Sequence, residues 1–120
     1  MTFNNINVSH SNVGVLNTGS IKKVDVALTA ITQAGNPELS AAITTFTNAV
    51  LAHADVVAQA KDNIVGLVEV IASEATQSPE KRRKYLVRPV ILEIATLVSG
   101  VADLASLFDR VRPILEAAFN

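Results

Sequence analysis

Apolar residues recur at alternating spacings of four and three along most of the chain, which is typical of amphipathic helices. The first series follows a helix-start signal at Asn36-Pro37-Glu38, where asparagine suits the N-cap and proline the first helical turn. Its members are Leu39, Ile43, Phe46, Val50, His53, Val57, Ala60, Ile64, Leu67 and Ile71. The spacing predicts a helical segment of about 40 residues, or about 60 Å.

A second series follows a repeat of the start signal at Ser78-Pro79-Glu80. Its members are Val87, Val90, Ile94, Leu97, Val101, Leu104, Phe108, Val111 and Leu115. Two segments of similar length joined by a short link around residues 76–78 are typical of antiparallel neighbours. We therefore predict a mainly α fold in which residues 36–120 form a long antiparallel helical hairpin with a coiled-coil seam.

Several residues could interrupt these long helices. Pro89 and Pro113 each lack a backbone donor, and Gly100 lies near the middle of the second segment. His53 and Asp55 lie near the middle of the first. If both segments broke at these midpoints, the alternative would be a compact bundle of four or five shorter helices. The continuous spacing favours the long hairpin.

The apolar face of both segments is wider than one coiled-coil seam. The additional apolar residues are Val56, Val65, Val68, Val70, Leu86, Ile91, Val98, Leu107 and Ile114. A two-helix hairpin buries one seam per helix, so the wider face must pack against residues 21–34 or against another chain. We therefore expect a homo-oligomer.

Residues 1–20 differ in kind, because they contain no charged side chain and their apolar residues partly alternate with polar ones. This alternation predicts a short N-terminal β segment that mediates association. Residues 21–35 form a connecting helix or strand. Apolar residues spaced three and four apart suit a helix ending at Gly35, whereas the run from Val24 to Leu28 also suits a strand. We predict a strand up to about Val24 and a helix after it.

The segment Ser11-Asn12-Val13-Gly14-Val15-Leu16-Asn17 resembles the core of RIP homotypic interaction motifs and the related bacterial amyloid signalling motifs. Asn12, Val13, Gly14 and Asn17 match the order of that core, while Ser11 stands where an aliphatic residue is expected. The resemblance implies homotypic self-association, and short uncharged segments with flanking amides can stack as cross-β. The candidate self-association residues are Asn12, Val13, Gly14, Val15 and Asn17. An ordinary β-hairpin is the other interpretation.

A broader resemblance covers nearly the whole chain. The succession NINVSHSNVGVLNTGSI, NPELSAAITTFTNAV, VEVIASEATQSPEKRRK, LASLF and RPILEAAF resembles a poorly characterised family of small bacterial domains. In that family an Asn/Gly-rich β segment precedes a helical bundle, and the helical region often breaks near the position of residues 53–57. Its members typically carry Trp and Gly where this chain has Phe108 and Arg112. The resemblance implies an association module and supplies no activity.

Composition narrows the chemistry. A chain of 120 residues allows one domain, and a net charge of −1 gives no overall attraction to nucleic acid or membrane. The absence of cysteine excludes disulfides and thiolate sites. His53 on the apolar stripe is best explained as a core or register residue, and His10 has no evident partner. We expect no catalytic residue, no metal and no cofactor.

The strongest charge cluster places five cations within eight residues: Lys81, Arg82, Arg83, Lys84 and Arg88. The cluster is a candidate patch for an anionic partner. The alternative is a solvated helix tip whose cations pair with Glu74 or Glu80. Nucleic acid is disfavoured because no aromatic residues are interleaved with the cations.

These observations predict a non-enzymatic protein–protein interaction and homo-oligomerisation module, expected in bacterial signalling or defence. The alternative is a membrane-active helical effector, which a net charge near zero does not favour. No window of 18 residues is both predominantly apolar and free of charge, and the N-terminus lacks the basic and apolar regions of a signal peptide. We therefore expect a cytoplasmic protein.

Overall fold

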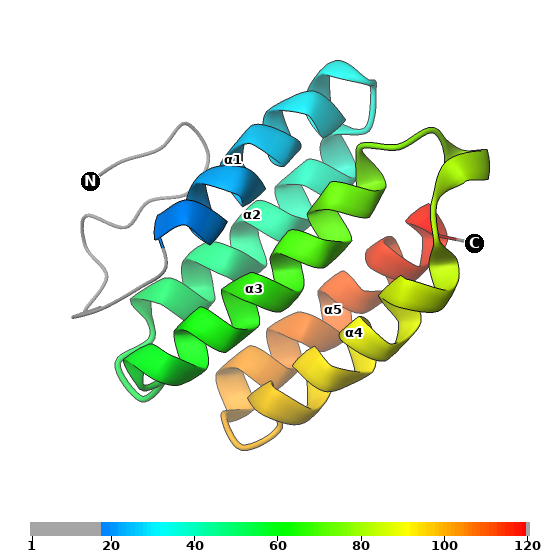
Figure 1. The fold of residues 1–120 in the computed structure, drawn as a ribbon. Helices are drawn as coiled ribbons and strands as arrows, with labels where there is room; N and C mark the ends of the chain where they lie inside the picture. Colours follow the sequence, from blue (N-terminus) through cyan, green and yellow to red (C-terminus); the bar gives the residue numbers. More distant parts are fainter. Residues whose placement is uncertain (1–17, 120) are drawn as a thin grey trace.

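The computed structural model describes residues 18–119, which form five α-helices and one short 3-10 turn (Figure 1). The elements are α1 (Thr18–Gln33), α2 (Pro37–Ala52), α3 (Ala58–Ala75), the 3-10 turn η1 (Pro79–Lys81), α4 (Lys84–Val98) and α5 (Ala102–Ala118). The prediction of a mainly α fold is confirmed. Most of the predicted β segment lies outside the described residues. None of the described helices is long and apolar enough to cross a bilayer.

Four of the helices close into a ring, and the fifth covers one side of it. Helix α2 packs against α3, α3 against α4, α4 against α5, and α5 back against α2. Helix α1 packs on both α2 and α3, and α4 and α5 lie side by side (Figure 1). The described residues measure 38 × 28 × 20 Å along their principal axes. This length is well short of the long hairpin.

The predicted long hairpin is therefore wrong, and the alternative of a compact bundle is confirmed. The first segment breaks between Ala52 and Ala58, and the second between Val98 and Ala102. These links contain His53 and Gly100, the midpoints at which breaks were considered. Because the chain folds back at these links, each helix packs against at least two others and buries more than one side, which a hairpin of two long helices does not allow.

The four-and-three spacing continues through the first break by coincidence. Val57, which the spacing places in the core, is 68% exposed, because it lies in the link before α3. Within α3, Ile64 and Ile71 of the predicted series are buried. The buried face also includes Lys61, Val65 and Val68, each one residue after a member of that series. The core face of α3 is thus rotated from the one that the spacing predicts.

The wider apolar face is largely covered within one chain. Val56, Val65 and Val68 belong to the core cluster, as do Ile91 and Val98 from α4. Because α1 packs along α3, the region expected to need either residues 21–34 or another chain is served by residues 21–34. The surplus of apolar residues therefore does not require a second copy.

Residues 18–33 are helical throughout, so the predicted strand up to Val24 is wrong. Ile21, Val24, Leu28 and Ile31 are all buried, which is the outcome of one helical face with spacings of three and four. The helix stops before Gly35, whose φ of 94° is unfavourable for residues with a side chain. The predicted boundary between residues 20 and 21 falls inside α1.

The predicted start of α2 is confirmed in detail. The side chain of Asn36 accepts a hydrogen bond of 3.3 Å from the backbone N–H of Leu39, and Pro37 is the first residue of the helix. This cap satisfies one of the donors that a helix leaves free at its N-terminus. Together with Gly35, it sets the tight turn that lays α1 against α2.

Lys61 is a charged residue at a core position. Its side chain is enclosed, with 1% of the residue exposed, and Nζ donates a 2.7 Å hydrogen bond to the carbonyl of Leu51. That carbonyl lies in the last turn of α2, where carbonyls lack partners within the helix. Burial lowers the pKa of Lys61 below its ordinary value of 10.5. Lys61, in the first turn of α3, thus satisfies a free carbonyl at the end of α2.

An aromatic pair occupies the centre of the bundle. Phe46 of α2 and Phe108 of α5 are both buried, and their ring centroids lie 5.1 Å apart at an interplanar angle of 49°. This tilted arrangement is one that aromatic rings prefer. The pair joins two helices from the two halves of the chain.

We predict that Phe46→Ala and Phe108→Ala each lower the unfolding free energy by about 3–5 kcal/mol, because each removes a buried ring. The double variant should fall short of the sum by about 0.5–1.5 kcal/mol, since the rings contact each other. Urea denaturation measures all three values. Tyr85→Ala, at an exposed aromatic, is the matched control, and a loss as large as that of Phe108→Ala would contradict the prediction.

We predict that the unfolding free energy of the wild type rises relative to that of Lys61→Met as the pH increases from 7 toward 10.5. The folded state holds the Lys61 proton less tightly than the unfolded state, so removing protons favours folding in this range. Denaturation of both proteins in the same buffers measures the difference. A difference that stays constant across the range would contradict the lowered pKa.

Candidate interaction surface

The five predicted cations lie where the chain passes from α3 to α4. Lys81 ends η1, Arg82 and Arg83 form the link, and Lys84 and Arg88 lie on the first turns of α4. The sequence places the whole run in the first turns of one helix, but the structure divides it between a turn, a link and a helix. This division separates the cations into two groups with different surroundings.

Arg82 holds two helix ends together. Its Nη1 donates a 2.7 Å hydrogen bond to the carbonyl of Ala118 in α5, and Nη2 donates one of 3.0 Å to that of Ala75 in α3. Nε donates to the carbonyl of Gln77 at 3.0 Å. The guanidinium carbon also lies 5.7 Å from the centre of the Phe119 ring. All three nitrogens of the Arg82 guanidinium group thus donate to carbonyls within the fold.

Arg83 forms an ion pair with Glu74. Nη2 lies 2.6 Å from Oε2, Nε donates to the same oxygen at 3.1 Å, and the Arg83 backbone N–H donates to Oε1 at 3.0 Å. The Glu74 side chain is 6% exposed. Hydrogen bonds from the Arg83 side chain and backbone hold the pKa of Glu74 below its ordinary value. Arg83 thus pairs with one of the two glutamates that the sequence offered.

Lys81, Lys84 and Arg88 form the second group. Their side chains make no hydrogen bond or ion pair with another residue of the described range 18–119, and they border an open depression together with Tyr85. Lys81 and Arg88 are exposed, and Lys84 is half-buried. Of the predicted anionic-partner patch, these three cations remain available to another molecule.

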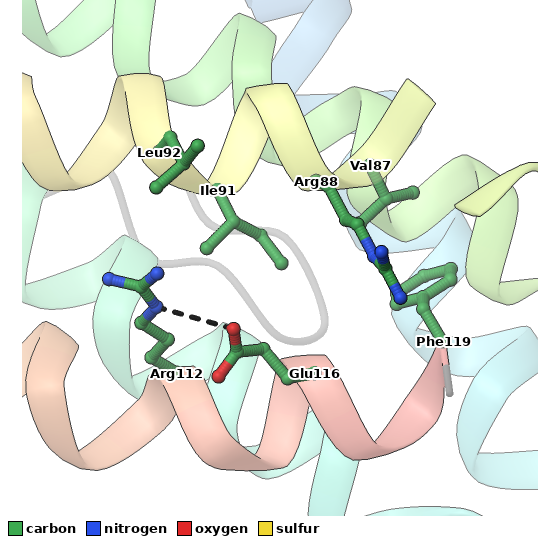
Figure 2. Close-up of a pocket in the computed structure, with 7 residues that line it drawn as sticks. All are labelled: Val87, Arg88, Ile91, Leu92, Arg112, Glu116 and Phe119. Carbon is green, nitrogen blue, oxygen red and sulfur yellow. Dashed lines mark ion pairs between the residues drawn. The ribbon is translucent and has the colours of Figure 1, made fainter. Parts of the chain in front are cut away.

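Arg88 also borders a second hollow, a groove between α4 and α5, which we call the α4–α5 groove (Figure 2). Its floor consists of Val87, Ile91 and Phe119, and its volume is about 460 Å³. The floor residues are buried hydrophobics of the core, so the groove is a shallow opening onto the core rather than a separate chamber.

Side chains from both helices, most of them charged, form the walls of the groove. Arg88 and Leu92 come from α4, and Arg112 and Glu116 come from α5 (Figure 2). Arg112 Nε lies 3.5 Å from Glu116 Oε2. Sequence reasoning missed these α5 residues, because they lie more than twenty positions after the basic run. Their i, i+4 spacing placed them on one helix face, but only the fold brings that face to α4.

Apolar side chains extend the surface along the outside of α4. Tyr85 is 71% exposed and Leu92 is 56% exposed, although both belong to a helix whose other side is in the core. We use "α4 surface" for the three available cations, these two residues and the α4–α5 groove. It combines positive charge with exposed apolar area.

The remaining predicted sites are accounted for as follows. Asn12, Val13, Gly14, Val15 and Asn17 lie outside the described residues. Within residues 18–119 no group of three or more His, Asp or Glu side chains is arranged to hold a metal ion.

His53 lies in the link between α2 and α3. Its Nδ1 accepts a 3.2 Å hydrogen bond from the backbone N–H of Asp55, and its Nε2 lies 3.9 Å from Asp103 Oδ2 at the start of α5. The half-buried imidazole therefore lies where the α2–α3 link meets the start of α5. It is a residue of the links rather than of the predicted seam.

Comparison of the chain with protein-family models, curated proteins and solved structures found no match. The resemblance to small bacterial domains therefore stays an expectation from the sequence, and the surface must be interpreted from its own chemistry.

We predict that Glu74→Gln lowers the urea midpoint of unfolding at pH 7, and that its difference from the wild type shrinks as the pH falls below about 4. The lowered pKa means that the carboxylate stabilises the fold above the ordinary value of 4.5 and loses this effect once it is protonated. Glu80→Gln is the control, since this exposed glutamate makes no ion pair with another described residue. An equal loss in the control, or a gap that widens in acid, would contradict the prediction.

Proposed function

We propose that this protein is a non-enzymatic protein–protein interaction and homo-oligomerisation module, acting as an adaptor in bacterial signalling or defence. The observation that carries the proposal is the α4 surface, where available cations and exposed apolar side chains adjoin one groove. Arginine and tyrosine are enriched in protein interfaces, where they combine contact area with directional hydrogen bonds.

The interior of the bundle offers less to a ligand than this surface does. The void at the centre of the described core, beside Phe46 and Phe108, has a volume of about 10 Å³. That is about the space that one water molecule needs. Recognition is therefore proposed on the outside of the helices, where side chains of a partner can reach.

The homotypic part of the proposal rests on residues 11–17. Their uncharged composition and their resemblance to homotypic interaction motifs favour pairing between copies of the chain. The apolar surplus of the helices no longer supports it, because α1 covers that face within one chain. The segment and the bundle thus have separable roles, with association in the first and the stable body in the second.

We predict that Val13→Asp lowers the oligomeric state while helicity is retained, because a charge repeated on neighbouring paired segments repels itself. Light scattering gives the mass, and circular dichroism gives the helix content. Thr45→Asp adds the same charge at an exposed position of α2 and should leave the mass unchanged. A Val13→Asp protein with wild-type mass would assign the assembly to the helices or leave the chain monomeric, and either result refutes the homotypic role.

A further inference from the structure

We infer that the α4–α5 groove binds an acidic amphipathic helix from a partner protein. The inference rests on the proposed function as an interaction module, and it names the partner chemistry of the α4 surface. Three features of the groove carry it: its position between two helices, the charge on its walls, and the acidic side chain that it already contains.

The position of the groove suits a third helix. It lies between α4, of 15 residues, and α5, of 17 residues, which pack side by side (Figure 1). Val87, Ile91 and Phe119 form an apolar floor between them. These three residues are at most 3% exposed, so the apolar side chains of a partner helix, at spacings of three and four, would mainly contact the exposed apolar edge of the groove, while its flanks face the walls. Leu92 at the edge adds exposed apolar area for the same contact.

The charges on the walls select an acidic partner. Arg88 stands on the α4 wall and Arg112 on the α5 wall, so cations flank the floor from both sides (Figure 2). The planar guanidinium group binds carboxylates through two parallel hydrogen bonds. Lys84 lies one helical turn before Arg88, and Lys81 lies just beyond it, so the positive charge continues along α4. Glutamates on successive turns of a partner helix would meet this line.

Glu116 shows the chemistry that the groove accepts. Its side chain lines the groove, is 55% exposed, and places Oε2 3.5 Å from Arg112 Nε on the α5 wall. A carboxylate that enters must share Arg112 with Glu116 or displace it. Neutralising Glu116 should therefore strengthen the binding of an acidic helix, which is the opposite of the effect expected for a residue that merely stabilises the surface.

Flat or uniformly anionic partners fit less well. A uniformly anionic bilayer surface would meet the carboxylate of Glu116 together with Arg88 and Arg112 on the walls. A phosphate backbone would also pass the carboxylates of Glu80, Glu93 and Glu116, which lie on or beside the same helices. A helix with both apolar and acidic positions matches the exposed Leu92 and the two wall arginines together.

The test measures binding of the full chain to a synthetic helix of about 18 residues, about 27 Å long, built from leucine, alanine and glutamate. A twin peptide carries glutamine in place of every glutamate. Calorimetry should show the glutamate peptide binding at least about tenfold more tightly at low salt, with the difference shrinking as salt increases. Equal affinity of the two peptides, or no binding of the acidic one, would overturn the inference.

Variants of the chain locate the binding. Arg88→Gln and Arg112→Gln should each weaken the acidic peptide about tenfold, because each removes one carboxylate partner. Glu116→Gln should strengthen it about threefold, since a competing carboxylate is removed. Arg110→Gln is the matched control, because Arg110 is exposed on α5 and does not line the groove. A loss in this control equal to that of Arg88→Gln, or weaker binding by Glu116→Gln, would refute the assignment to the groove.

Two further measurements separate the competing explanations. Vesicles of phosphatidylserine and phosphatidylcholine test the membrane alternative, and tight binding or leakage of vesicles without binding of the acidic peptide would replace the inference with a membrane surface. Light scattering of the unmodified chain tests self-association, which does not involve the groove. A monomer that binds the peptide would refute the oligomeric function alone, whereas an oligomer that ignores the peptide would refute the groove alone. Circular dichroism of each variant confirms that it is folded.

Discussion

Helix ends govern this structure, because a chain folded into five short helices has many terminal carbonyls without partners inside their own helices. Two cationic side chains supply hydrogen bonds at three of these ends. Lys61 binds a carbonyl in the last turn of α2, and Arg82 binds one at the end of α3 and another at the end of α5. A cationic side chain is favourable at a helix C-terminus for two reasons: it donates hydrogen bonds to the free carbonyls, and it is attracted by the partial negative charge there. The compact bundle depends on these contacts in a way that two continuous helices would not.

The balance between the long and the compact form is decided by burial. A hairpin of two long helices would expose the wider apolar face, including Val65 and Val68, which the bundle encloses. Each buried side chain of this size contributes about 1.5–3 kcal/mol. Against this stands the unfavourable burial of the Lys61 ammonium, which is limited by its hydrogen bond to Leu51. Several apolar side chains therefore outweigh one confined charge.

The sequence predicted what depends on local spacing. The helical class, the cap at Asn36, the turn at Gly35 and the burial of Phe46 and Phe108 all follow from neighbours along the chain. The breaks did not follow, because the spacing of four and three runs through residues 53–57 although the helix does not. Lys61 was missed for a related reason: a lysine on a helix predicts a solvated face, and only the nearby end of α2 explains its burial.

The candidate surface was predictable only in part, because a run of like charges says nothing of which members the fold will use. In the structure, Arg82 and Arg83 bind groups of the fold between α3 and α4. Lys81, Lys84 and Arg88 border the open depression instead. The α5 wall of the groove, with Arg112 and Glu116, required the pairing of α4 with α5, which no local pattern contains.

The two groups of cations are nevertheless connected through one aromatic ring. Arg82 lies over Phe119 and binds the carbonyl of the residue before it, while Phe119 itself forms part of the groove floor. A side chain that seals the end of α5 therefore also fixes the surface on which a partner would rest. Arg88 borders the same floor from α4, whereas Arg83 is bound to Glu74. In this bundle Arg82 shapes the floor of the groove, and Arg88 and Arg112 give its walls their positive charge.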